Sequence, residues 1–417
     1  MIGNFVEWYD LAIYAYTAAA IGKIFFVGLD PGLQVIVSFA VFALTYLVRP
    51  VAGAVLGVVG DRFGRKNLLI FTILIMGFAT TAIGLLPGHS QWGAAATFLL
   101  LFFRVLQGVG AAGEFMGAAT FVVEHSPKLR RGLAMGLIQL GTGLCYPAAF
   151  GAALALIHFG GQDWFNEGGW RILFLISAPL TLVALYIRRH LDETPVFREM
   201  KSRNLLSKSP LREVVMSHGN RMIAAFLFML VFGVNGAQLL FYFPNRVGEL
   251  AGESGRWIAL SCMVIYAVSI PIWGYLLDRM SRHSARMIYC IGGLVLPIPC
   301  HMLILGGNLY ALTSAYVLLG ILVGLAFAIV YVTLVEIIPA SVRFTGTALV
   351  DNTLKALIVG PAVLVSLILV RETGSNIAPA YYATALGVLS FVGALWISRI
   401  QKDELHQGVD KLAVAKA

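Results

Sequence analysis

The stretch Gly57-Val58-Val59-Gly60-Asp61-Arg62-Phe63-Gly64-Arg65-Lys66 separates two long hydrophobic segments, and its pattern returns later in the chain. Gly274-x-x-x-Asp278-Arg279-x-x-Arg282 follows at an offset of 217 residues. A second pattern, Glu124-x-x-Pro127-x-x-x-Arg131, recurs at an offset of 212 as Glu336-x-x-Pro339-x-x-x-Arg343. Two charged patterns that repeat in the same order at nearly one offset indicate an internal duplication.

The composition predicts a membrane protein. Of the 417 residues, 59% are hydrophobic and only 12% are charged, and the mean hydropathy is +0.83. A soluble domain has about a quarter charged residues. Twelve stretches are long enough to cross about 30 Å of hydrocarbon as helices: 2-26, 33-57, 67-86, 94-123, 133-158, 170-189, 220-244, 256-277, 286-305, 309-335, 346-370 and 377-399. They lack the short apolar/polar alternation of barrel strands, so we expect an all-α membrane protein.

The longest polar break, at about 190 to 219, divides the twelve spans six and six. We therefore expect an N-terminal six-helix bundle at 1-190, a linker at 191-219, a C-terminal six-helix bundle at 220-400 and a tail at 401-417. Paired bundles of this kind suit alternating access to a central site. The repeated charges are then candidates for gating contacts, although the basic ones alone can serve merely to orient the chain. The gating candidates are Asp61, Arg62, Arg65, Glu124, Arg131, Asp278, Arg279, Glu336 and Arg343.

The net charge of +9 has a topological explanation. Most Lys and Arg residues fall on alternate breaks and on the C-terminal tail, and by the positive-inside rule those breaks face the cytoplasm together with both termini. The positive charge therefore predicts orientation, not nucleic-acid binding. The first span begins at once and carries Glu7 and Asp10, so we expect a retained helix instead of a cleaved signal peptide.

Charges inside spanning helices are costly and mark functional pathways. Depth along the helices, at about 1.5 Å per residue, puts Arg104 near the midplane and allows Asp10 to pair with Arg49. A fixed cation beside a titratable carboxylate is what proton coupling requires. The candidates for proton coupling are Glu7, Asp10, Arg104 and Glu114. The alternatives are helix-start acids for Glu7 and Asp10, and a structural ion pair for Arg49 and Glu114.

Asp351 and Lys355 are spaced i, i+4 and can neutralise each other on one helix face. The alternative is that Lys355 faces a central cavity and takes a substrate carboxylate. Aromatic faces attract quaternary ammonium groups, although core packing explains buried aromatic residues equally well. The candidates for substrate binding are Trp8, Tyr14, Arg49, Tyr146, Asn235, Gln238, Tyr242 and Lys355.

The sequence gives no sign of catalysis. All four cysteines, Cys145, Cys262, Cys290 and Cys300, fall in apolar spans without metal-ligand spacing, so we expect neither disulfides nor a metal site. No nucleophile triad or HExxH pattern occurs, and the run from Gly57 to Lys66 lacks the phosphate-binding spacing. We expect a protein that is not an enzyme and needs no cofactor. We expect it to use the proton gradient and to act as a monomer, in the lipid bilayer, on a small molecule.

These motifs resemble those of the major facilitator superfamily and, within it, the metabolite:proton symporter family. The run from Gly57 to Lys66 resembles the superfamily's loop between helices two and three, and Arg104-x-x-Gln107-Gly108 its fourth-helix RxxQG motif, whose arginine the family implicates in proton coupling. More specific to the symporters are Gly3 to Asp10, Ala112-Gly113-Glu114 and Asp192 to Phe197. The resemblance implies proton-driven import of a small carboxylate-bearing metabolite across a bacterial inner membrane.

Members of that family carry proline or betaine, α-ketoglutarate, citrate or shikimate, so the resemblance leaves an organic acid and a zwitterion both open. The run from Ile21 to Phe26 is similar to the proline/betaine members, whereas the charged Asp351 and Lys355 depart from the mostly uncharged residues expected there. The alternative function is an antiporter that exports a metabolite or drug. Exporters often carry GPxxGG in helix five, where this chain has Gly141-Thr142-Gly143.

Overall fold

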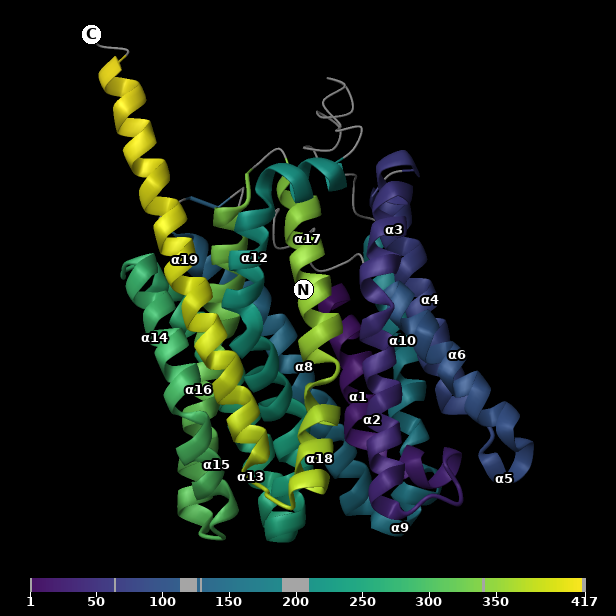
Figure 1. Ribbon diagram of the computed structural model, residues 1–417. Coiled ribbons are helices and arrows are strands. Elements are labelled where there is room, and N and C mark those ends of the chain that lie inside the picture. The colour runs from purple at the N-terminus through teal and green to yellow at the C-terminus, as the bar shows by residue number, and fades with distance from the viewer. Residues whose placement is uncertain are drawn as a thin grey trace.

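The computed structural model describes residues 2–63, 65–112, 126–127, 130–189, 210–339 and 342–414, without the side chains of some helix ends such as 57–63 and 404–414. Within these ranges the chain is almost entirely helical and forms no strand (Figure 1). The elements are α1 (Ile2–Phe25), α2 (Pro31–Leu47), α3 (Arg49–Phe63), α4 (Arg65–Leu85), α5 (His89–Trp92), α6 (Ala94–Gly110), α8 (Arg131–Gly160), α9 (Gln162–Trp164), η2 (Phe165–Gly169), α10 (Arg171–Arg189), α12 (Pro210–Ala237), η3 (Gln238–Tyr242), α13 (Phe243–Leu277), α14 (Arg282–Val295), α15 (Pro297–Leu305), α16 (Leu309–Ile337), α17 (Arg343–Leu354), η5 (Lys355–Val359), α18 (Ala362–Thr373) and α19 (Ala378–Val414).

These elements account for the twelve predicted spans. Six described helical stretches are long and apolar enough to cross a membrane, and two bent pairs bring the number to eight. One of the six, Val215–Leu277, contains two spans, because the chain turns back at Gly252, where φ is 58°. The shorter apolar helices Ile70–Leu85 and Ala94–Gly110 add two more, and α1 is the twelfth.

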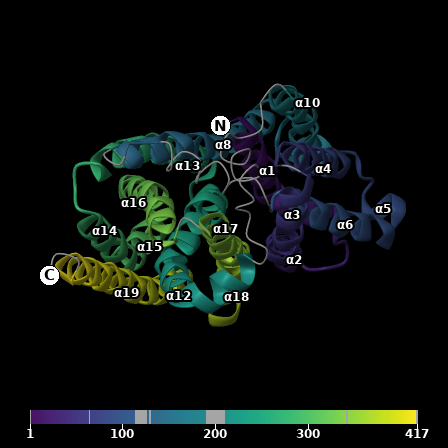
Figure 2. The same cartoon turned by 90° about the horizontal axis from the view of Figure 1, so that it is seen from above.

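The helices form two bundles, as the duplication predicts. Seen from above, α1 to α10 lie on one side and α12 to α19 on the other, with α8 and α13 side by side at the boundary (Figure 2). Glycines allow this contact to be close: a Cβ added to Gly132 on α8 would lie 2.5 Å from the carbonyl oxygen of Gly274 on α13. Small residues at such crossings let two backbones approach within van der Waals range.

The structure extends two of the predicted segments. α12 begins at Pro210, ten residues before the predicted span, with a non-helical φ of −128° at His218. α19 continues through most of the predicted tail to Val414, because that tail is rich in Gln, Lys, Glu and Leu, which favour helix. The predicted linker at 191-219 lies outside the described residues except for its last part, from Pro210 onward.

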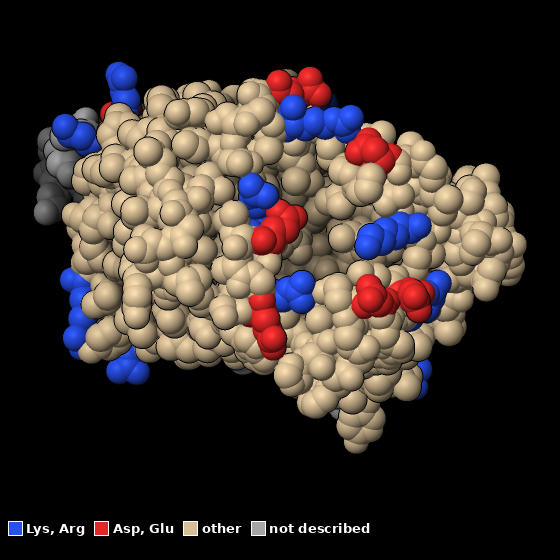
Figure 3. All heavy atoms as spheres, turned by 90° about the horizontal axis from the view of Figure 1, so that it is seen from below, with Lys and Arg blue, Asp and Glu red and all other residues tan. Residues whose placement is uncertain are grey.

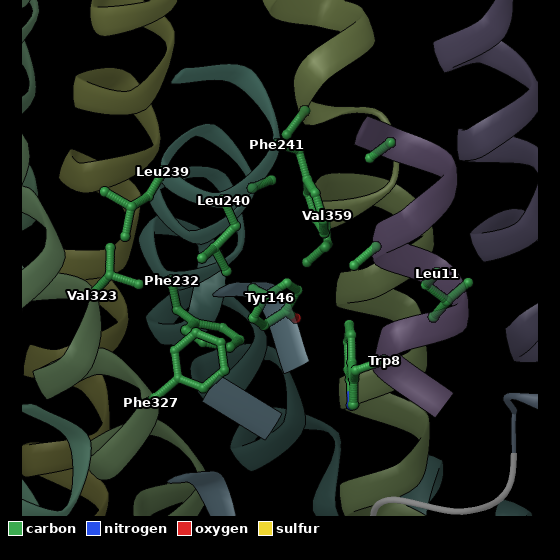
Figure 4. Close-up of a cluster of buried hydrophobic side chains, with 14 of the residues drawn as sticks. Trp8, Leu11, Tyr146, Phe232, Leu239, Leu240, Phe241, Val323, Phe327 and Val359 are labelled. Atoms are coloured by element: carbon green, nitrogen blue, oxygen red, sulfur yellow. The ribbon is translucent and has the colours of Figure 1, made fainter. Parts of the chain in front are cut away.

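Large apolar side chains fill the space between the bundles. Trp8 from α1 and Tyr146 from α8 lie on the side of Phe232, Phe241 and Phe327 of the second bundle, and the centre of the molecule is aromatic (Figure 4).

Candidate functional site

A cavity of about 400 Å³ opens between the bundles, and it is called the wide cavity below. Lys23, at the end of α1, and Asn376, just before α19, both line it, so it opens at the end of the molecule opposite the two chain termini. Figure 3 shows this face, with a hollow surrounded by Lys, Arg, Asp and Glu side chains. Its polar lining consists of Lys23, Gln162, Asn166, Tyr242, Asn245, Arg246, Glu249, Arg256 and Asn376, together with Tyr16.

A second, smaller space lies deeper between the bundles, and it is called the inner chamber. Its volume is about 30 Å³, which accommodates about two water molecules. Three predicted substrate-binding residues line it, Trp8, Tyr146 and Lys355. Gln139, Thr142, Tyr331 and several apolar residues also line the inner chamber, although no sequence pattern distinguished them.

Phe241 lines both spaces and therefore forms the partition between them. Its ring centroid lies 5.7 Å from that of Tyr146 on the chamber side and 6.3 Å from that of Tyr16 on the cavity side. Phe241 belongs to η3 and Lys355 to η5, both of them π-helical segments within spanning helices. Such segments are often found at functional sites.

Lys355 forms the predicted ion pair and also faces a cavity, which is the position that the alternative interpretation requires. Its Nζ lies 2.7 Å from Asp351 Oδ2, so the i, i+4 pair forms, and its side chain also lines the inner chamber. The Tyr331 hydroxyl donates a hydrogen bond of 3.0 Å to Asp351 Oδ1. Asp351 and Lys355 are both buried, and Nζ of Lys355 lies 4.9 Å from the centre of the Trp8 ring.

A continuous chain of buried hydrogen bonds joins Arg104 to Asp10 in the first bundle. Arg104 Nη1 donates to Gln107 Oε1 at 2.6 Å, and Gln107 Nε2 donates to the Thr80 hydroxyl at 2.7 Å. That hydroxyl lies 2.9 Å from Asp10 Oδ2, and Ser177 donates to Asp10 Oδ1 at 2.6 Å. These five residues, from α1, α4, α6 and α10, are called the Asp10 relay. The relay connects two of the predicted proton-coupling residues, Asp10 and Arg104.

The predicted pairing of Arg49 with Asp10 is wrong, because Arg49 pairs with Glu7. Arg49 Nη2 lies 3.6 Å from Glu7 Oε1, and both side chains are almost completely buried. The guanidinium also lies over the Tyr46 ring at 4.7 Å. Counting residues gives the depth of a side chain in the membrane but not the direction it faces, and Asp10 faces α4 and α10 instead.

Other predicted binding residues have roles within their own bundle. Tyr14 lies under the Arg104 guanidinium, 3.9 Å from ring centre to carbon, and Tyr14 and Arg49 line neither space. Gln238 Nε2 donates to Ser366 Oγ at 3.2 Å and to Pro379 O at 2.9 Å, so it ties η3 to α18 and α19. Asn235 is buried on α12 and also lines neither space.

At the termini end the two bundles are held together by Asp278. Its carboxylate accepts hydrogen bonds from the backbone N–H of Gly132 at 2.7 Å and of Leu133 at 2.9 Å, at the first turn of α8 in the opposite bundle. A carboxylate at a helix N-terminus satisfies N–H groups that have no partner within the helix. Asp278 therefore caps a helix across the boundary.

A second contact at this end joins three of the repeated charges. Glu336 lies between Arg131 of the first bundle, at 3.9 Å, and Arg282 of its own bundle, at 3.5 Å. Two other gating candidates contact only their own bundle in the interactions described: Arg279 lies over the Tyr275 ring, and Arg343 Nε donates to Ile338 O. The side chains of Asp61, Arg62 and Arg65, and all of Glu114 and Glu124, lie outside the described residues.

No group of three or more His, Cys, Asp or Glu residues that suits a metal ion occurs in the part of the chain that the structure describes. The four cysteines are free and buried. Among the described residues, the buried charges treated above form three features: the Asp10 relay, the Glu7–Arg49 pair and the Asp351–Lys355 pair.

Comparison with known proteins identifies the family of the chain. The profile of the Major Facilitator Superfamily matches residues 1–362. The chain is 30% identical to the glycine betaine/proline/ectoine/pipecolic acid transporter OusA of Dickeya dadantii, over 95% of this chain and 81% of that one. It is 30% identical to the proline/betaine transporter of Salmonella typhimurium over 94% and 80%, and 32% identical to a putative proline/betaine transporter of Staphylococcus aureus over 94% and 85%.

Among solved structures, the D-xylose-proton symporter is similar, with a TM-score of 0.73 at 16% identity over 95% of both chains. The xylose transporter XylE of E. coli, in a partially occluded inward-open conformation, gives 0.72 at 16% identity, again over 95% of both chains. This likeness shows the fold, and the curated relatives confirm the resemblance to proline/betaine transporters. With the family profile extending over both bundles and with relatives that are transporters over nearly the whole length, the chain is a membrane transporter that belongs to the Major Facilitator Superfamily.

Proposed function

We propose that this transporter imports a small carboxylate-bearing metabolite together with protons. The observation that carries the proposal is the Asp10 relay. In this relay the buried carboxylate of Asp10 is connected to the buried guanidinium of Arg104 by hydrogen bonds through the uncharged side chains of Thr80 and Gln107. Ionisable groups inside spanning helices are expensive and are kept where they move ions. The relatives named as transporters of proline and betaine support the substrate class.

The Thr80 hydroxyl gives the relay two states. It has one proton and two acceptors within reach, Asp10 Oδ2 and the carbonyl oxygen of Met76, each at 2.9 Å. With Asp10 ionised, the hydroxyl donates to the carboxylate. With Asp10 protonated, the hydroxyl turns to Met76, and the carboxyl proton takes its place in the contact. Loading a proton on Asp10 therefore reverses the hydrogen bond between Asp10 and Thr80 without leaving a buried donor unsatisfied.

The distribution of basic residues supports an orientation with the termini end in the cytoplasm. In that orientation the wide cavity opens to the outside, and the contacts of Asp278 and Glu336 hold the cytoplasmic side shut. Protons and substrate then load from outside. Rocking of the bundles along α8 and α13 breaks the contacts at the cytoplasmic end and releases both inward.

In the proposed cycle the substrate carboxylate reaches Lys355 in the inner chamber, between Trp8 and Tyr146. The chamber widens to admit it, and the Phe241 ring moves out of the partition so that the chamber joins the wide cavity. The proton gradient supplies the driving force without a cofactor. One copy of the chain contains both bundles and the chamber, so we take the monomer as the functional unit.

Uptake into proteoliposomes tests this function. Labelled proline, glycine betaine, α-ketoglutarate, citrate and shikimate are offered with an inward proton gradient, and again with a protonophore. We expect one of them to accumulate and the accumulation to collapse with protonophore, and the Asp10→Asn variant to accumulate less of that compound than the unmodified chain. The matched control is Glu253→Gln, an exposed carboxylate at the opposite end. Equilibration by the unmodified chain that ignores the gradient would make it a uniporter.

A further inference from the structure

The charge presented to a substrate is not balanced along its path. Among the described residues that line the inner chamber, Lys355 is the only charged side chain. Its partner Asp351 does not line the chamber and is held by Tyr331, at 3.0 Å. A molecule in the chamber therefore meets the ammonium group of the pair and not its carboxylate.

The surroundings of the chamber are unfavourable to a cationic group. The Trp8 ring, the largest aromatic surface of the chamber, already has Lys355 Nζ at 4.9 Å and the Arg49 guanidinium at 5.7 Å. A ring that already interacts with two cations has little attraction left for a substrate ammonium.

The wide cavity has the same bias towards anions. It is lined by Lys23, Arg246 and Arg256 against a single described carboxylate, Glu249. Arg246 is paired with Glu249 at 2.8 Å, whereas Lys23 and Arg256 form no ion pair with a described carboxylate. A cleft lined by one sign of charge raises the local concentration of the opposite ion.

We propose that the substrate is a net-anionic carboxylate that replaces Asp351 on the Lys355 ammonium, and that Asp351 takes up a proton as it is displaced. The inference rests on the proposed function and deepens it, because it selects the organic acid over the zwitterion. In the step, one proton from outside binds an oxygen of Asp351, the Lys355–Asp351 ion pair breaks, and a Lys355–substrate ion pair forms. Inward release reverses each change.

The reason is charge balance in a buried space. Two carboxylates beside one ammonium would leave a negative charge without compensation, and burying such a charge is far more costly than protonating one carboxylate. The nearby Glu7 and Arg49 already compensate each other, at 3.6 Å. From the other packed elements, Tyr331 of α16 and Tyr46 of α2 contribute only neutral phenols. The substrate carboxylate therefore takes the place of Asp351 beside the Lys355 ammonium.

The position of the pair also connects this protonation to the movement of the bundles. Asn352, the residue after Asp351, donates from Nδ2 to the carbonyl oxygen of Ala112 in the opposite bundle, at 3.2 Å. A Cβ added to Gly53 on α3 would lie 3.1 Å from the same Nδ2. The segment that carries Asp351 and Lys355 is therefore part of the contact between the bundles that opens in the inward-facing conformation.

Proton uptake on binding tests the proposal. The purified chain is kept in weakly buffered detergent solution with a pH-sensitive dye, and each of the five compounds offered in the transport assay is added in turn. We expect an organic acid to bind, with about one proton more taken up per bound molecule by the unmodified chain than by Asp351→Asn. Glu253→Gln is the matched control and should take up as many protons as the unmodified chain.

The possible results separate this inference from the proposed function. Accumulation of proline or betaine, but of no organic acid, would overturn the anion assignment and leave proton symport standing. Equal proton uptake by Asp351→Asn and the unmodified chain would overturn the role of Asp351. If Asp351→Asn does not fold, the neutral double variant Asp351→Asn/Lys355→Gln replaces it. This double variant should bind no organic acid, and binding with undiminished proton uptake would contradict the proposal.

Discussion

The two bundles share a scaffold but carry their charges in different helices. At the offset of 212 residues, Gly108 corresponds to Gly320, and each glycine lies against another helix of its own bundle, Gly108 next to Thr45 on α2 and Gly320 next to Tyr266 on α13. Arg104 corresponds to Tyr316, whose hydroxyl only donates to the carbonyl oxygen of Leu239, at 2.8 Å. The duplication has kept the packing of this helix in both bundles and the charge in only one.

One helix later, the charges are instead found only in the second bundle. Asp351 and Lys355 of the second bundle correspond to Gln139 and Gly143 of the first, and Gln139 lines the inner chamber opposite Lys355. The Asp10 relay and the Asp351–Lys355 pair therefore lie at positions of the two bundles that are not equivalent. The repeat retains the packing contacts of the bundles, whereas these buried charges lie where the two halves depart from the repeat.

The largest effect is expected from breaking the Asp10 relay. Arg104→Gln should strongly reduce accumulation against a gradient, because the cation that stabilises the ionised relay is lost, while insertion remains. The measurement is uptake with and without protonophore in proteoliposomes. Tyr316→Phe, at the corresponding position, is the control and removes one hydrogen bond worth about 1 kcal/mol. Equal loss of accumulation in both variants would mean that the bundles do not differ as described.

Lys355→Gln should be the most destabilising single change at the second ionic feature. It leaves Asp351 buried without its cation, which costs about 3–5 kcal/mol. The double variant Asp351→Asn/Lys355→Gln should recover most of that stability, since no uncompensated charge remains. Thermal unfolding in detergent, followed for both variants, checks this expectation. A double variant as unstable as Lys355→Gln would show that the pair is held by packing and not by charge.

A bulkier residue at the glycine contact should shift the conformational equilibrium. Gly132→Val puts a side chain against the Gly274 backbone, and such overpacking costs about 1–3 kcal/mol, which corresponds to roughly a 5- to 150-fold shift away from the closed cytoplasmic side. The readout is the rate at which a thiol reagent labels the cysteine of an added Asn245→Cys substitution in the wide cavity. This rate should fall. Gly151→Ala, where an added Cβ would have its nearest neighbour at 3.5 Å, is the control and should leave the rate unchanged.

The smallest effect is expected from the cap across the bundle boundary. Asp278→Ala removes the acceptor for two N–H groups at the start of α8 and should weaken the closed side by about 0.5–2 kcal/mol. Asp278→Asn keeps an acceptor and should recover part of that loss. The same labelling of Asn245→Cys measures both variants. An Asn variant no better than Ala would indicate that the charge of Asp278, and not its hydrogen bonding, closes the gate.

Hydrophobic spans and the repeat predicted the fold well, because both depend on composition along a single helix. The i, i+4 spacing of Asp351 and Lys355 also predicted their pairing, since the geometry of one helix determines it. The partner of Arg49 and the direction of Gln238 depend on how helices are rotated about their axes, which hydropathy does not report. In the case of Gln238, the π-helical turn of η3 also changes the face on which the side chain lies.

Thr80 and Ser177 illustrate the limit of prediction from one sequence. Hydroxyl residues are common in apolar helices, where they satisfy themselves on a carbonyl oxygen of the preceding turn, as Thr80 can with Met76. Only the packing of α1 against α4 and α10 gives these two residues a carboxylate to bond. Nothing in the sequence around either residue distinguishes it from the other Ser and Thr residues of the spans.

The partition made by Phe241 has a kinetic consequence. Phe241 lines both the wide cavity and the inner chamber, so in the proposed cycle the substrate is admitted by the rotation of one side chain together with the widening of the chamber. Side-chain rotations are far faster than the μs–ms movements of whole domains. In the proposed cycle the rotation of Phe241 therefore does not limit turnover, and the turnover number reports the slower movements that widen the chamber and rock the bundles.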